Sequence, residues 1–180
     1  MPLNLTRSLL VVLIPGIIAF APWLIWAVRE FENIAALYTT FKEAVTVGVF
    51  AAVVVFGAVI EIINSWIESR WDETREGEFA VTENWYSYLA HAVEKESIGY
   101  GYISRMVTTM YFELALMWAF PAFALGLVVM NVTSATTSNS FCGVAALLGI
   151  AFSVGSYQSA KESHRVLCKT RLEINKRVRS

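Results

Sequence analysis

Charged residues are scarce in this sequence of 180 residues, and cysteines are scarcer still. Asp, Glu, Lys and Arg make up 16% of the chain and hydrophobic residues 56%, whereas a soluble domain carries about 25% charged residues. So little polar surface cannot cover a soluble domain, and so apolar a composition excludes a disordered tail. The two cysteines, Cys142 and Cys168, are too few for a disulfide scaffold, and we interpret them as free thiols.

An excess of one sign of charge is also missing. The chain has 14 Lys and Arg against 15 Asp and Glu, a formal net charge of −1. No overall field would draw a polyanion towards such a chain, so we expect no nucleic-acid partner.

The motifs of familiar soluble enzymes are absent from the sequence. It contains no P-loop, no G-x-G-x-x-G after a strand, no G-x-S-x-G and no H-E-x-x-H. His91 and Glu94 form only an H-x-x-E pair, and His164 lies in a basic tail where we expect it to be solvated. We therefore predict no metal-binding residue, and the sequence indicates no particular cofactor.

Long apolar runs are what the sequence does contain. The core of a bilayer is about 30 Å thick, so a spanning helix needs about 20 mostly apolar residues. The run from Ser8 to Val28 is uncharged over 21 positions, longer than the apolar part of a signal peptide, and Pro15 and Pro22 should kink it. Within a single membrane domain of residues 1–180, we predict spans at residues 8–28, 44–65, 108–130 and 141–157.

The basic residues orient these spans. The tail from Lys161 to Ser180 carries seven basic and two acidic residues, whereas the loop from Asn131 to Ser140 carries no charge. Because Lys and Arg concentrate in cytoplasmic loops, the tail is expected inside and this loop outside. We predict an integral protein of a bacterial inner membrane with both termini in the cytoplasm. Residues 66–105 then form a cytoplasmic insertion, and residues 158–180 a basic cytoplasmic tail.

The predicted fold class is all-α: a polytopic membrane protein with a four-helix transmembrane bundle, a cytoplasmic helical hairpin and a basic C-terminal helix. In the hairpin, the second span continues as a helix to about Thr74, with Gly77 as a stop signal. A second helix runs from about Thr82 to Glu96, and residues 97–102 turn the chain back towards the third span.

Two cytoplasmic segments carry opposite charge. Residues 61–96 contain nine acidic and three basic residues, while the tail is basic. Either the two segments attract each other, or the tail binds anionic lipid head groups, at about 1 kcal/mol per basic residue near the surface. The candidate lipid-binding residues are Lys161, Arg165, Lys169, Arg171, Lys176, Arg177 and Arg179.

Polar residues at the ends of the spans are candidates for a membrane pathway. An ionisable group within the membrane is costly and therefore commonly functional. Glu61 and Glu113 are predicted at similar depth, where they could line a cation or proton path together with Asn64. Alternatively, Glu113 could pair with Arg105, two turns away on the same helix.

A stripe of acceptors follows the second span. Spacings of three, four and four residues place Glu61, Asn64, Glu68 and Asp72 on one helical face. Hard oxygen ligands of this kind could hold Mg²⁺ for phosphoryl transfer. The stripe could equally face water or the basic tail.

The same run, E-I-I-N-S-W-I-E-S-R-W-D from Glu61 to Asp72, resembles the E-x-x-N-S-x-x-E-x-x-x-D segment of the small prokaryotic diacylglycerol and undecaprenol kinases. The resemblance implies a lipid kinase dependent on Mg-ATP, with Glu68 in the catalytic carboxylate position and Asn64 and Asp72 around it. It covers twelve residues, and Trp66 stands where that family has a small residue.

Small residues recur every four positions in two of the predicted spans, and such stripes let helices approach closely in lipid. They are Ala44, Gly48 and Ala52 in the second span and Ala145, Gly149 and Ser153 in the fourth. The stripes could pack within one chain, but we expect a homo-oligomer or a subunit of a larger membrane complex.

Two functions remain open, and with them the question of whether the chain is an enzyme. The first is a membrane pore, transport-like component or membrane sensor or effector with a charged cytoplasmic layer, such as a bacterial defence or envelope complex would contain. The alternative is the lipid-kinase-like phosphotransferase built on the stripe from Glu61 to Asp72. Both require membrane lipids as partners.

Overall fold

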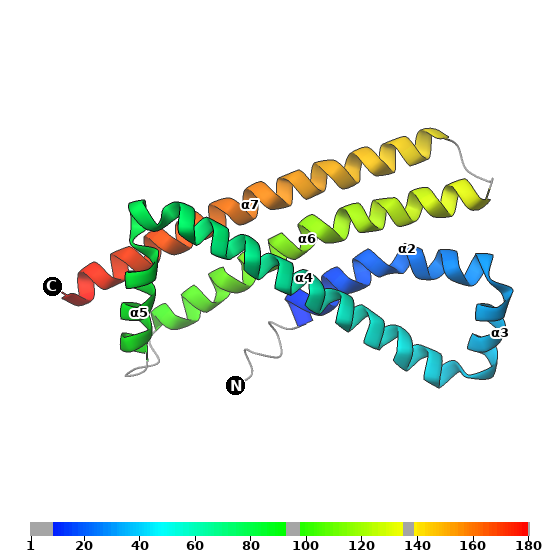
Figure 1. Ribbon diagram of the computed structural model, residues 1–180, viewed down its shortest axis with the longest axis horizontal. Helices are drawn as coiled ribbons and strands as arrows, with labels where there is room; N and C mark the ends of the chain where they lie inside the picture. Colours follow the sequence, from blue (N-terminus) through cyan, green and yellow to red (C-terminus); the bar gives the residue numbers. More distant parts are fainter. Residues whose placement is uncertain (1–8, 93–97, 135–138, 180) are drawn as a thin grey trace.

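The computed structural model describes residues 9–92, 98–134 and 139–179, and every element in these ranges is a helix (Figure 1). The elements are the π-helix η1 (Leu9–Leu13) and the α-helices α2 (Ile14–Glu30), α3 (Glu32–Thr40), α4 (Lys42–Phe79), α5 (Val81–Ala92), α6 (Ile98–Ser134) and α7 (Asn139–Arg179). The predicted all-α fold class is confirmed.

Four helices are long and apolar enough to cross a membrane, as expected of an integral membrane protein. The first of these helices is Val11–Glu30, which combines part of η1 with α2, and the other three are α4, α6 and α7. The last three are 38, 37 and 41 residues long, which at 1.5 Å per residue is roughly twice the thickness of a bilayer core. Each of these three helices is therefore long enough to contain a span and to continue well beyond it.

The continuous helices divide the molecule into two halves. We call residues 9–60, 114–134 and 139–157 the apolar half, and residues 61–92, 98–113 and 158–179 the polar half. The main hydrophobic core lies in the polar half and at its border with the apolar half. Its members are Val11, Trp71, Ile103, Met110, Tyr111, Leu114, Ala160 and Leu167.

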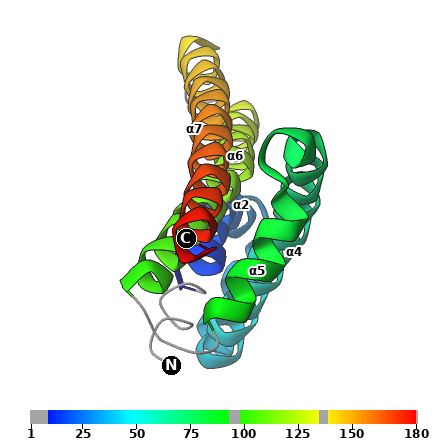
Figure 2. The same ribbon diagram turned by 90° about the vertical axis from the view of Figure 1, so that its left-hand side faces the viewer.

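In the apolar half, the spans pack in the order α7, α6, α2, α4. Figure 2 shows α6 and α7 on one side, α4 on the other, and α2 between them. The crossing of α4 with the N-terminal segment depends on glycine. A Cβ at Gly57 would collide with the carbonyl oxygen of Val12, and one at Gly16 would lie 2.6 Å from that of Val53. The N-terminal part of α4, on the α3 side of this crossing, diverges from α6 and α7, whereas its C-terminal part reaches α7 (Figure 1).

The N-terminal span begins with a π-helical turn and continues as an α-helix. Pro15 lies in the first turn of α2, and the single π-helical turn η1 directly precedes this helix. Pro22 lies inside α2. The adjacent Trp23 donates from Nε1 to the carbonyl oxygen of Ala122 at 2.9 Å, which ties α2 to α6.

In the polar half, α4 and α5 meet at a tight corner. Helix α4 ends at Phe79, two residues after the predicted stop at Gly77, and Ala80 adopts a left-handed conformation with φ of 44°. Glu76 stabilises the start of α5 by accepting hydrogen bonds from the backbone N–H and the hydroxyl of Thr82, both at 3.0 Å. Helix α5 then contacts the C-terminal part of α7 (Figure 1).

The structure describes only part of the predicted hairpin and departs from it where α6 begins. The turn predicted at residues 97–102 is wrong from residue 98 onwards, because α6 begins at Ile98 and runs through both glycines of the G-Y-G segment. The predicted end of the second helix at Glu96 lies outside the described residues, as do Glu94 and the side chain of His91.

Candidate functional site

A cavity of about 430 Å³ opens in the polar half, between α4, α5, α6 and α7. Its lining combines acidic, basic, hydroxyl and aromatic side chains: Glu68, Asp72, Val81, Thr82, Trp85, Val107, Tyr111 and Arg171. Two of the carboxylates predicted from the stripe, Glu68 and Asp72, therefore share one cavity. They do so because they lie one turn apart on α4.

Glu68 is held in place across the cavity by α6. The hydroxyl of Tyr111 donates a hydrogen bond to Oε2 of Glu68. Tyr111 is itself buried in the hydrophobic core, so its hydroxyl is a fixed donor. A carboxylate that accepts this one bond keeps lone pairs on both oxygens for a ligand in the cavity.

Arg171 contributes the positive charge of the cavity, and its position corrects a prediction. We predicted it among the lipid-binding residues, but its side chain is 6% exposed. Its guanidinium lies 4.4 Å from the centroid of the Trp85 ring, a cation–π contact between α7 and α5. Arg171 is therefore part of the protein interior, because α5 folds back over the face of α7 that carries it.

His164 is the second correction. We predicted a solvated histidine in a basic tail, whereas its side chain is fully buried between α4 and α7. Its Nε2 lies 2.8 Å from Oδ1 of Asp72, and its Nδ1 contacts Nη1 of Arg75. An arginine can only donate, so Nδ1 must accept, and Nε2 must carry the proton that is donated to Asp72. His164 is thus a neutral imidazole that links an arginine and an aspartate of α4.

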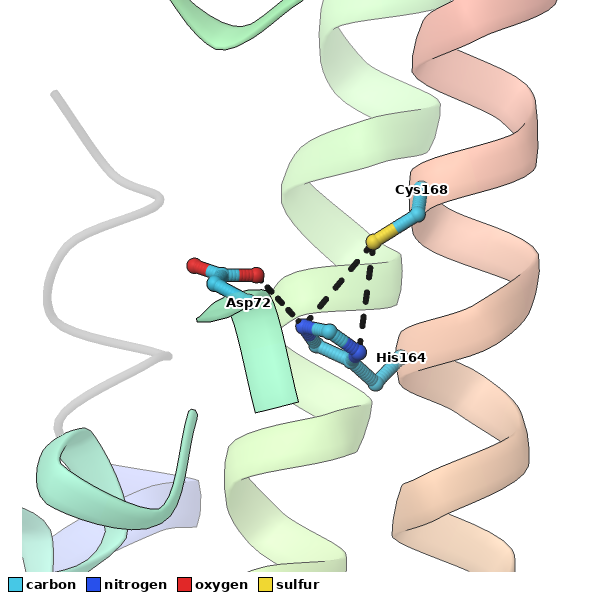
Figure 3. A group of neighbouring side chains, drawn as sticks. All are labelled: Asp72, His164 and Cys168. Carbon is cyan, nitrogen blue, oxygen red and sulfur yellow. Dashed lines mark hydrogen bonds and ion pairs between the residues drawn. The ribbon is translucent and has the colours of Figure 1, made fainter. Parts of the chain in front are cut away.

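Further contacts surround this histidine. Trp71 packs on it with the ring centroids 5.4 Å apart, and Nη2 of Arg75 donates to the carbonyl oxygen of Lys161 at 3.0 Å. Cys168 lies one turn further along α7, with its Sγ 3.9 Å from both ring nitrogens of His164 (Figure 3). These contacts join α4 to α7 in the polar half.

The Cys168 thiol has low nucleophilic reactivity. It is 3% exposed and lies outside the predicted span at residues 141–157. Burial, followed by the negative charge of Asp72, raises the pKa of this thiol to about 11. Cys168 is therefore protonated at neutral pH, and it is a weak nucleophile because the thiolate is the reactive form. Both cysteines are free thiols, as predicted.

Asn64 is separated from the other residues of the stripe. Its side chain is fully buried, and neither polar atom of its amide has a hydrogen-bond partner among the described residues. An unpaired buried group of this kind costs about 1–3 kcal/mol. Asn64 does not line the cavity of Glu68 and Asp72, and Glu61 is half-buried one turn before it.

Glu113 has partners that the sequence did not suggest. Its carboxylate accepts hydrogen bonds from the hydroxyls of Ser159 at 2.6 Å and Ser163 at 2.8 Å, both on α7. In the described part of the chain no ion pair joins it to Arg105, the partner considered from the sequence. Glu113 therefore fastens α6 to α7.

The remaining basic residues of α7 differ in exposure and partners. Lys161, Arg165 and Lys169 are exposed and follow one another at intervals of four residues, on one face of the helix. Lys176 is exposed and lies 3.4 Å from a carboxylate oxygen of Glu173. The side chains of Arg177 and Arg179, also predicted to bind lipid, lie outside the described part of the structure.

One sequence signal for the buried cluster was available and was missed. His164 and Cys168 are four residues apart, so they lie on the same face of a helix. Asp72 and Arg75 could not be found in this way, because they lie 92 and 89 positions away from His164 along the chain.

Comparisons of this chain with protein-family models, curated proteins and solved structures find no match. The resemblance to lipid kinases accordingly depends on the segment from Glu61 to Asp72 alone.

Proposed function

We propose that this chain is an integral protein of a bacterial inner membrane, with both termini in the cytoplasm, and that it assembles as a homo-oligomer whose spans form or gate an ion pathway. The observation that supports this proposal is the open order of the spans, α7, α6, α2, α4. A closed bundle buries the inner face of every helix, whereas here α4 and α7 lie at opposite edges (Figures 1 and 2).

Both edges have room for a neighbouring helix. Gly48 of α4 lines an open cavity of about 560 Å³ between α2, α3 and α4, which is the room at this end of the row. A Cβ added to Gly48, or to Gly143 on α7, would meet no atom within 4 Å. Gly149 of α7, by contrast, packs against Ala124 of α6 within the same chain, so it is not available to a neighbouring helix. In lipid, helices associate where small residues let their backbones approach.

Joining the two edges gives a closed ring. If α4 of one copy packs on α7 of the next, the contact is heterologous, and repeating it around an axis closes a cyclic oligomer. In the predicted topology α4 and α7 both run from the outer to the inner side. Gly48 and Gly143 both lie within the first two turns of their helices, so they would meet at similar depth.

The pathway would be lined by polar groups at the inner end of the spans. Glu61 is half-buried there, whereas Asn64 is fully buried within the chain, so we assign only Glu61 to the pathway. Glu113 is engaged by Ser159 and Ser163, so we assign it to holding α6 on α7. The exposed Lys161, Arg165 and Lys169 would contact anionic lipid and make the polar half responsive to the state of the membrane.

The experiment combines oligomeric mass with ion flux. We expect the purified chain to be oligomeric in detergent and to release ions from liposomes. Gly48→Leu should reduce both, because it fills the cavity between α2, α3 and α4 into which the neighbouring helix would pack. Phe50→Leu is the control, because residue 50 points about 200° away from residue 48 around the same helix. A monomer that carries no ions in liposomes would refute the proposal.

The ion pathway has its own variant. Glu61→Gln removes one charge at the inner end of the spans without changing the size of the side chain, so it should alter the cation selectivity of the flux while the oligomer stays intact. Unchanged selectivity would exclude Glu61 from the pathway.

A magnesium-dependent lipid phosphotransferase is the second candidate, favoured by the shared cavity of Glu68 and Asp72. Glu68→Gln should then abolish phosphate transfer from Mg-ATP to diacylglycerol. Glu73→Gln, an exposed carboxylate on the same helix, should leave the transfer unchanged. If the unmodified chain transfers no phosphate, this candidate is wrong.

A further inference from the structure

We propose that Asp72, His164 and Cys168 form a binding site for a divalent transition-metal ion of the zinc type. Each residue offers one ligand atom, and these atoms all lie within 4.8 Å of one another (Figure 3). The site joins α4, which supplies Asp72, to α7, which supplies the other two ligands. This inference goes beyond the proposed membrane function and is independent of it.

The three ligand types match zinc chemistry. Zinc accepts cysteine sulfur, histidine nitrogen and carboxylate oxygen at about 2.0–2.3 Å, which sets neighbouring ligand atoms of a tetrahedral site about 3–4 Å apart. Here Nε2 of His164 lies 2.8 Å from Oδ1 of Asp72 and 3.9 Å from Sγ of Cys168. The same Sγ is also 3.9 Å from Nδ1, so it lies on the Cε1 side of the ring. A change of the Cys168 rotamer, without movement of the helices, would bring the three ligand atoms around one ion bound at Nε2.

The surroundings hold the ligands in place. His164 and Cys168 are one turn apart on a continuous helix and are 0% and 3% exposed. Trp71 packs on the imidazole ring and fixes its plane. Three protein ligands leave a fourth position for water, and Asp72, whose side chain is 37% exposed and lines the 430 Å³ cavity, gives an ion its route from solvent.

Metal binding requires a defined exchange of protons. The Cys168 thiol loses its proton to solvent and becomes the thiolate ligand. His164 stays neutral, but its proton moves from Nε2 to Nδ1, so that the Nε2 lone pair binds the ion. With one thiolate and one carboxylate, a divalent ion is neutralised at the site.

Arg75 must respond to this exchange. Its Nη1 faces Nδ1 of His164, and once Nδ1 carries a proton the two groups are both donors. Metal binding therefore releases Arg75 from His164, while its second bond, to the carbonyl oxygen of Lys161, can persist. His164 thus has two alternative states: in one, Nδ1 accepts a hydrogen bond from Arg75, and in the other, Nε2 binds the ion.

Cobalt is the probe that tests the site. The full chain is purified in detergent, stripped with a chelator and titrated with Co²⁺. We expect one ion per chain, a thiolate-to-cobalt charge-transfer band in the near ultraviolet, the visible spectrum of tetrahedral cobalt, and displacement by Zn²⁺. Cobalt bound without a thiolate band would overturn the proposal, as would no binding at all.

Matched variants assign the ligands. Cys168→Ser should abolish the charge-transfer band, while Cys142→Ser, at the other cysteine, should retain it. Asp72→Asn should weaken binding by at least about tenfold, whereas Glu73→Gln, its exposed neighbour, should not. A band that survives Cys168→Ser, or cobalt affinity unchanged in Asp72→Asn, would refute the site. Asp72→Asn still decides the question if Cys168→Ser does not fold.

Arg75→Met tests the two alternative states. It removes the donor that opposes the metal-binding form of His164, so cobalt should bind more tightly than to the unmodified chain. Weaker binding in this variant would refute the exchange between Arg75 and the ion. Because every readout is metal binding to the purified chain, failure here leaves the ion-flux proposal standing, and the reverse also holds.

Discussion

The two halves of this molecule are stabilised in different ways. In the apolar half, large side chains such as Val47 and Leu147 are 68% exposed, whereas Met110 and Leu114, at the core of the polar half and its border, are fully buried. Lipid is a good solvent for the exposed side chains, so the apolar half needs only local helix contacts. The polar half meets water and must build a protein core. The three long helices run through both environments, and the solvent changes along each of them.

The largest test of this comparison is a pair of identical substitutions. Leu167→Ala, in the polar half, should lower the free energy of unfolding by about 2–5 kcal/mol, because Leu167 is fully buried and its truncation leaves a cavity in the core. Leu147→Ala, where lipid fills the space, should change it by less than about 1 kcal/mol. Unfolding in mixed micelles, followed by circular dichroism, measures both. Equal losses would show that the two halves do not differ as described.

A second pair compares two buried amides of the polar half. Asn64 is buried without a hydrogen-bond partner among the described residues, while Asn84 donates to the carbonyl oxygen of Phe79 and accepts from Asn175. Asn64→Leu should therefore stabilise the fold, by up to about 1–3 kcal/mol, and Asn84→Leu should destabilise it by a similar amount. Unfolding in mixed micelles, followed by circular dichroism, measures both changes in the free energy of unfolding. Destabilisation by Asn64→Leu would show that its amide does have a partner in the working protein.

The smallest expected effect concerns the surface of α7. Lys161→Ala should weaken binding to vesicles containing anionic lipid by about 1 kcal/mol, and less at high salt. Lys176→Ala should do less, because Glu173 already partly neutralises this lysine. Vesicle flotation of the detergent-purified chain at two salt concentrations provides the measurement. If neither variant changed vesicle binding, contact between α7 and the head groups would be excluded.

Much of the fold could be predicted because the relevant signals are local. A run of apolar residues and the thickness of a bilayer are enough to predict a span, so four spanning helices follow from the sequence. Likewise, the spacing of Glu68 and Asp72 predicts one helical face, and they do line one cavity. The turn expected near Gly99 and Gly101 is wrong because both glycines lie inside α6, and a glycine in a helix costs only about 1 kcal/mol relative to alanine.

The interior of the candidate site could not be predicted in this way. His164 and Arg171 lie in a basic segment, and basic segments are usually solvated. Both are buried here because α4 and α5 cover the face of α7 on which they lie. Periodicity shows which residues share a face, but it does not show which helix will cover that face.

By itself, the sequence determined that the chain is helical, that four of its helices can cross a membrane, and where its charge concentrates. Length, apolarity and charge are properties of neighbouring residues, so they can be read along the chain. Only the tertiary structure decided that Asp72 meets His164 and Cys168, that Tyr111 holds Glu68, and that the spans form an open row. Those contacts depend on how helices distant in sequence cross, and the crossing is set by packing at particular close approaches such as Gly57 against Val12.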